Sequence, residues 1–213
     1  MPHLTPPRSW KADPSRLLAR LPPVTLAFVA SLLLSLVAVG DEITVGRDAT
    51  LYLHAAQQAL ALGPGAAFQV YAWPWFSLLV AATHWLLGLP LEVAAYLWCA
   101  LFMAGSCALL VALTQRALPA SGYWACLVVL SVPAFNQFRD DIIREFGFWF
   151  FSILALWLAL RWLERGGWLR AGLLQLAIVL AALFRLEAVI VFAAVGLCLL
   201  GELRTRDGWL RLL

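Results

Sequence analysis

Apolar residues along the chain fall into long runs that short polar stretches separate. The runs cover about residues 22–40, 68–88, 91–114, 119–136, 146–163 and 171–200. A helix needs about 20 predominantly apolar residues to cross a bilayer, and several runs approach or exceed that length. The pattern therefore predicts an all-α, polytopic integral membrane protein whose transmembrane helices form a bundle.

The composition supports this class. Of the 213 residues, 63% are hydrophobic and only 13% are charged, and a soluble domain with that balance could not cover its surface with polar groups. The net charge of +3 comes from basic residues grouped at the ends of apolar runs, and no nucleic-acid-binding motif is present. The four cysteines lie inside apolar runs without metal-ligand spacing, so we expect free thiols. No cofactor is implied with certainty, and a divalent metal has no support in the sequence.

The basic residues set an orientation. They lie in the polar stretch 1–21, at Arg116, within 161–170 and within 204–211, and the positive-inside rule places all of these in the cytoplasm. That is consistent only if 68–88 does not cross. This segment contains Pro74 between two tryptophans, and indoles prefer the membrane interface.

The resulting map has three parts. We predict a cytoplasmic N-terminal tail at 1–21, followed by an uncleaved first transmembrane helix. The transmembrane module then spans 22–200, with an outer loop of juxtamembrane helices at 41–90. Run 171–200 crosses and returns, turning near Arg185 and Glu187. Residues 201–213 form a cytoplasmic end that we expect to continue in a longer protein.

This orientation brings three charged segments to one outer face: the acidic loop at 41–48, the run FRDDIIREF at 138–146, and the turn at 185–187. If the second segment is helical, Asp140 lies beside Arg144, and Asp141 beside Glu145. Purely structural roles are open for all three segments. Acidic side chains can cap helices, salt bridges can stabilise helix ends, and an arginine can snorkel to the surface.

Several motifs occur in a characteristic order. Asp48 is followed by Tyr52 and Ala56, then by YAWPWF at 71–76. Ser131, Pro133, Arg139, Glu145, Phe150, Phe151 and Arg185 follow. This order resembles the start of a GT-C membrane glycosyltransferase, in the branch of protein O-mannosyltransferases and lipid A aminoarabinose transferases. The resemblance covers about residues 24–200, and such enzymes are usually at least twice this length. It departs from the family where Val132 separates Ser131 from Pro133, and where the usual Asp is replaced, leaving Glu145 or Asp140 for that role.

The resemblance implies a GT-C-like helix bundle and transfer of a sugar from a polyprenyl-phosphate carrier to a glycan, lipid or protein acceptor outside the cytoplasm. It implies Asp48 as the general base, with Asp41 in reserve, and displacement with inversion. The arginines suited to the phosphate are Arg144 and Arg185, with Arg139 and Arg47 behind them. Glu145 or Asp140 orients those arginines or holds the acceptor, and Tyr52 and Glu187 contact substrate.

Two other functions fit the same charges. A transporter or flippase fragment would use Arg185 and the 138–146 run to bind an anionic or lipid-linked substrate, although no inverted repeat is evident. A non-catalytic subunit would use its charges only for topology. The Ala-, Leu-, Arg- and Trp-rich usage, without eukaryotic sorting signals, indicates a bacterial inner membrane.

Overall fold

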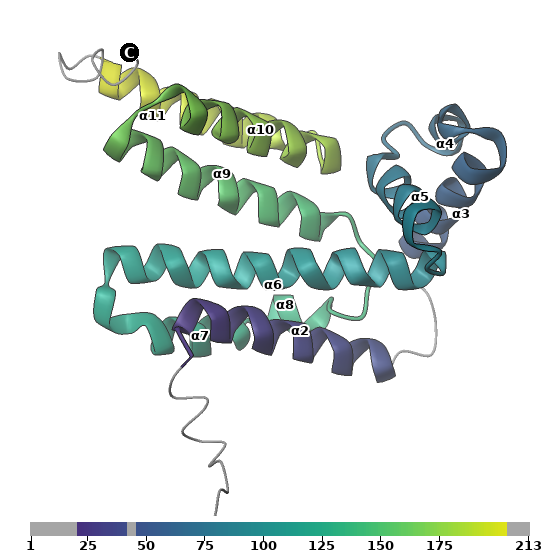
Figure 1. Ribbon diagram of the computed structural model, residues 1–213, viewed down its shortest axis with the longest axis horizontal. Helices are drawn as coiled ribbons and strands as arrows, with labels where there is room; N and C mark the ends of the chain where they lie inside the picture. The colour runs from purple at the N-terminus through teal and green to yellow at the C-terminus, as the bar shows by residue number, and fades with distance from the viewer. Residues whose placement is uncertain (1–20, 42–45, 204–213) are drawn as a thin grey trace, which may run out of the picture.

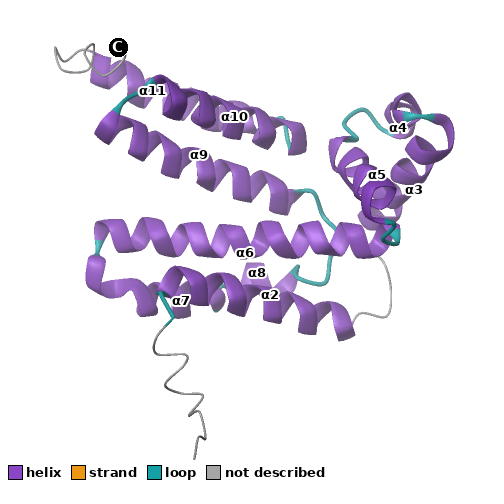
Figure 2. Ribbon diagram, viewed as in Figure 1, coloured by secondary structure: helices purple, strands orange, loops and turns teal. Residues whose placement is uncertain are grey.

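The computed structural model describes residues 21–41 and 46–203, and these residues are helical with no strand among them (Figures 1 and 2). The helices are α2 (Pro23–Asp41), α3 (Arg47–Leu62), α4 (Pro64–Val70), α5 (Trp75–Leu87), α6 (Leu91–Ala117), the 3₁₀ turn η1 (Pro119–Ser121), α7 (Gly122–Leu130), α8 (Pro133–Gln137), α9 (Glu145–Arg165), α10 (Trp168–Phe184) and α11 (Ala188–Leu203). The all-α prediction is therefore confirmed for the described residues.

The long helices lie side by side. In Figure 1, α6 lies between α2 and α9, α10 packs on the other side of α9, and α11 returns alongside α10. Phenylalanines from three helices fill the centre, where Phe102 of α6 contacts Phe151 of α9 and Phe184 of α10 with ring centroids 5.6 and 5.1 Å apart. Such aromatic contacts add to the apolar burial that holds the helices together.

Three helices are long and apolar enough to cross a membrane: Pro23–Gly40, Leu91–Ala117 and Glu145–Arg165. They match the predicted runs at 22–40, 91–114 and 146–163. Large apolar side chains also point outward, such as Leu36 on α2, which is 70% exposed, and Ile190 on α11, which is 71% exposed. An apolar face of this kind is suited to contact with lipid or another protein.

The segment between α2 and α6 forms a group of short helices at one end of the bundle (Figure 1). The helices predicted within 41–90 are present as α3, α4 and α5. The run 68–88 is broken into α4 and the 13-residue α5, because Pro74 lies at the junction. Trp73 Nε1 donates a 3.0 Å hydrogen bond to the carbonyl of Ala182, so this junction is attached to the end of α10.

One predicted helix is wrong, and a second segment lacks the helical spacing considered for it. Run 119–136 is divided among η1, α7 and α8, and α7 has only nine residues, because Pro133 disfavours a helical conformation at Val132. The run 138–144 turns, and helix begins at Glu145. Side chains within 138–145 contact different neighbours: Arg139 donates hydrogen bonds to α2, and Glu145 accepts one from Arg185, the residue that follows α10. The helical spacing expected for Asp140 and Arg144 is therefore absent.

The reversal predicted within 171–200 is confirmed. Helix α10 ends at Phe184, α11 begins at Ala188, and the turn between them contains Arg185 and Glu187. The preceding reversal, between α9 and α10, uses two glycines with φ of 60° and 98°, values that side chains with a Cβ rarely adopt. At that end of the bundle, Arg116 of α6 forms an ion pair with Glu164 of α9.

Close contact between α9 and α10 depends on Gly147, where an added Cβ would overlap the ring of Phe184. That ring is packed among Phe76, Phe102 and Phe151, so it has little room to move. We expect Gly147→Ala to lower the free energy of unfolding by about 1–3 kcal/mol through overpacking, measured by thermal unfolding in detergent. Gly172→Ala on α10 is the control, because nothing lies within 4 Å of its Cβ position. Equal stability of the two variants would contradict this packing role.

Candidate functional site

The described parts of the three charged segments lie at the same end of the bundle. That end contains the start of α3, the 138–145 segment and the α10–α11 turn (Figure 1). Their proximity is explicit in one contact, since Arg185 Nη1 forms an ion pair with the carboxylate of Glu145, forty residues earlier. The sequence prediction that these segments meet on one face agrees with this arrangement.

Arg185 is the link between two carboxylates. Its Nη1 contacts Glu145 Oε1, and its Nη2 contacts Glu187 Oε1. The hydrogen bond from Arg185 lowers the pKa of Glu187 to about 2, because it stabilises the charged form. Both guanidinium ends thus have acidic partners, and Arg185 is committed to this network.

A pocket of about 390 Å³ opens beside Glu145. It is lined by three carboxylates, Asp48, Asp141 and Glu145, together with Arg47, Trp149 and apolar side chains. Asp48 lies in the first turn of α3, where the helix dipole favours negative charge. The side chain of Asp48 is exposed. Its accessibility leaves it open to a molecule that enters from water.

A second pocket, of about 480 Å³, lies on the other side of this network. Arg144, Glu187 and Trp73 line its polar part, and Leu186, Val189 and Ile190 form an apolar wall. The Nε of Arg144 is buried and has no hydrogen-bond partner within the described residues. An unsatisfied buried donor is costly, so the Arg144 guanidinium that lines this pocket has hydrogen-bonding capacity that the described residues do not meet.

Two tyrosines lie near the charged residues of these pockets. Tyr52 and Tyr71 have ring centroids 5.8 Å apart, and Tyr71 shares a 3.0 Å hydrogen bond with Ser77. Burial, followed by the charge of Glu145, raises the pKa of Tyr52 above its usual range, so the hydroxyl stays protonated at neutral pH. Tyr52 is only 6% exposed. It is packed in the core and lines neither pocket, and its direct contact with substrate stays a prediction.

The remaining predicted residues are dispersed. Arg139 is 3% exposed and bonds to Ser31 and Ser35 of α2, so the structure gives it a packing role. Asp140 does not line either pocket. Arg47 lines the first pocket, which we call the acidic pocket because Asp48, Asp141 and Glu145 line it.

The side chain of the reserve acid Asp41 falls outside the described residues. Asp141, next to Asp140, is the acid that the site prediction missed. The sequence shows Asp141 in a charged run, but helical spacing would place it beside Glu145 and does not indicate that it faces Asp48.

The first pocket offers carboxylates to a ligand, and the second pocket offers the Arg144 guanidinium. Among the residues that the structure describes, no group of three or more His, Cys, Asp or Glu side chains is arranged to hold a metal ion. The chemistry that these residues can supply is general base catalysis by Asp48 and electrostatic stabilisation of an anion by Arg144.

Comparison with known proteins finds no matching family model, no matching curated protein and no matching solved structure.

Proposed function

We propose that this chain is a glycosyltransferase module that transfers a sugar from a polyprenyl-phosphate carrier to an acceptor on the outer face of a bacterial inner membrane. The observation that carries the proposal is the pocket at Arg144, where a buried donor without a partner adjoins an exposed apolar wall. An anionic head and an apolar tail on one molecule match those two features. The order of sequence motifs that resembles the GT-C branch supplies the reaction.

The distribution of charge supports the outer location. Arg116, Arg161, Arg165 and Arg170 lie at the ends of α6, α9 and α10 remote from the site. If that end is cytoplasmic, as the positive-inside rule requires, the N-terminus is cytoplasmic and the site faces the periplasm. The lipid tail of the carrier then lies along α11, where Val189 and Ile190 are 63% and 71% exposed.

The proposed reaction uses these residues in the following roles. Asp48 takes the proton of the acceptor hydroxyl or amine, and the acceptor atom forms a bond to the anomeric carbon of the sugar. The bond between that carbon and the phosphate oxygen breaks, and its electron pair leaves with the phosphate. Arg144 stabilises the charge that develops on the phosphate. Glu145 and Glu187 hold Arg185 beside it. A single displacement of this kind inverts the anomeric centre.

Binding of the carrier tests the proposal directly. Native mass spectrometry of the detergent-purified protein with added polyprenyl phosphate should show a one-to-one complex. Arg144→Ala should weaken this complex by about 10- to 100-fold, the effect of losing a charge-assisted hydrogen bond. Arg161→Ala is the matched control, since this arginine lies over the ring of Trp157 at the opposite end of α9. Absence of a complex, or equal binding by both variants, would refute the carrier site.

A further inference from the structure

A groove between α2 and α6 is separate from the two pockets described above. It has a volume of about 410 Å³ and is lined mainly by Leu32, Leu36 and Val39 of α2 and by Val93, Leu97 and Ala100 of α6. Both helices are long and apolar enough to cross a membrane. The groove therefore lies where lipid chains would surround the protein, and a hydrocarbon chain is the occupant that its lining fits.

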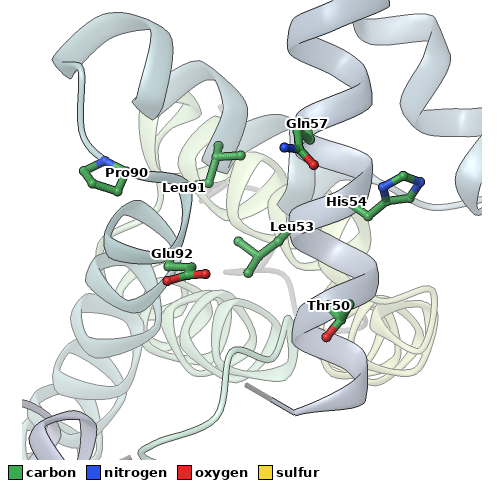
Figure 3. A pocket seen from close by; sticks show the side chains of 7 residues that line it. All are labelled: Thr50, Leu53, His54, Gln57, Pro90, Leu91 and Glu92. Carbon is green, nitrogen blue, oxygen red and sulfur yellow. The ribbon is translucent and has the colours of Figure 1, made fainter. Parts of the chain in front are cut away.

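A polar pocket adjoins the end of this groove. Its polar lining comes from Thr50, His54 and Gln57 of α3 and from Glu92 of α6, in a space of about 600 Å³ (Figure 3). Leu53, Pro90 and Leu91 form the apolar part of the lining. Glu92 directly precedes Val93 of the groove, so the first turn of α6 borders both spaces. A molecule with an apolar chain and a polar head can occupy the two together.

The head pocket differs in charge from the site at Arg144. Among the residues that the structure describes, Glu92 is the only acidic side chain that lines it, and no lysine or arginine does. The pocket thus favours an ammonium group near Glu92. Gln57 offers amide donors to head-group oxygens, whereas the Thr50 hydroxyl already donates to the carbonyl of Gly46. This combination matches a head that carries both an amine and a phosphodiester.

The exposed side of α3 joins this pocket to the proposed base. A further hollow of about 610 Å³ is lined by Arg47, Asp48, Thr50, Leu51 and His54. It shares Thr50 and His54 with the head pocket, and it shares Arg47 and Asp48 with the acidic pocket. A head group in the first pocket is therefore connected to Asp48 by a continuous surface along one helix.

We propose that the α2–α6 groove and the pocket beside Glu92 bind a membrane amphiphile with an ammonium head group, of the phosphatidylethanolamine class. The role of this amphiphile rests on the proposed function: it occupies the acceptor position, and the chain glycosylates a lipid. The carrier occupies the opposite side of the Glu145–Arg185 pair, so the two amphiphiles approach Asp48 from different faces of the bundle.

Photolabelling tests the site without any need for turnover. The protein would be reconstituted in nanodiscs that contain phosphatidylethanolamine with a diazirine in one acyl chain, and labelled residues would be mapped by peptide mass spectrometry. We expect labels concentrated on the groove residues of α2 and α6. Ala100→Trp fills the groove and should remove those labels, whereas Ala194→Trp, at an exposed position of α11, should retain them. Labels spread evenly over all exposed apolar faces, or unchanged in folded Ala100→Trp, would overturn the proposal.

The head group is tested by a milder variant. Glu92 is exposed, so Glu92→Gln should fold normally. We expect it to lower the preference for labelled phosphatidylethanolamine over labelled phosphatidylglycerol by about two- to five-fold, the effect of losing one exposed charge pair. An unchanged preference would exclude Glu92 as the head-group ligand. Because these measurements use no carrier lipid, they can succeed when polyprenyl phosphate fails to bind, and they can fail when it binds.

Discussion

Asp48→Asn is expected to lower the rate of sugar transfer by about 10²- to 10⁴-fold, the range associated with loss of a general base. The side chain is exposed at the start of α3 and lines the pocket that contains Glu145. Asparagine keeps its size and polarity but cannot accept the proton. The measurement is the release of free polyprenyl phosphate from polyprenyl-phosphate sugars in membranes that contain the protein.

The same variant should bind the carrier as tightly as the unchanged protein, because Arg144 and the apolar wall remain. Asp140→Asn is the matched control, since this aspartate does not line the pocket and should transfer normally. If Asp48→Asn retains full activity while Asp141→Asn loses it, the base is Asp141. That outcome would keep the transferase and replace its catalytic residue.

Asp48→Asn also separates the competing functions. A transporter of anionic lipids would depend more on Arg185, which joins Glu145 and Glu187, than on Asp48. A non-catalytic subunit would depend on neither residue for any measured turnover. The ion pairs of Arg185 lie at a helix turn at the end of the bundle. Transporter sites are typically built from broken helices near the bilayer midplane, so this position favours the transferase.

Hydrophobic run length predicted the three longest helices, because an uninterrupted apolar run of about 20 residues can form one membrane-spanning helix. Runs 22–40, 91–114 and 146–163 became α2, α6 and α9 with small changes at their ends. The turn at Arg185 and Glu187 was also predictable, since charged residues that interrupt an apolar run are costly inside a membrane. Run length could not show that Pro133 would divide 119–136.

Tertiary contacts explain what the sequence could not predict about the site. The spacing of charges at 138–145 is compatible with a helix. It does not show which residues, distant in sequence, each of these side chains contacts. Asp141 faces the start of α3, where a Cβ at Gly46 would be 3.4 Å from its Oδ1. Arg144 faces the α10–α11 turn instead. Which of two adjacent aspartates lines a pocket is decided by such long-range contacts.

The second large effect is expected at Arg139, which attaches the 138–145 segment to α2. Its Nη1 donates hydrogen bonds of 3.0 Å to the Ser31 carbonyl, 3.0 Å to the Ser31 hydroxyl and 3.1 Å to the Ser35 hydroxyl. Its Nε donates to Asn136 Oδ1 at 2.8 Å. Because hydrogen bonds within membrane proteins average about 0.6 kcal/mol, we expect Arg139→Ala to lower the free energy of unfolding by about 2–3 kcal/mol.

The measurement is thermal unfolding in detergent, with Arg47→Ala as the control, because Arg47 is an exposed residue at the start of α3 and its loss should change stability little. Arg139→Met keeps most of the buried volume and removes the desolvation cost of a charge whose partners are neutral oxygens. It should therefore be more stable than Arg139→Ala. Loosening this attachment also frees the segment that aligns Glu145 with Arg185, so carrier binding should fall in both Arg139 variants. If Arg139→Ala matches Arg47→Ala in stability, the guanidinium does not anchor the segment, and its predicted contact with a phosphate would have to be reconsidered.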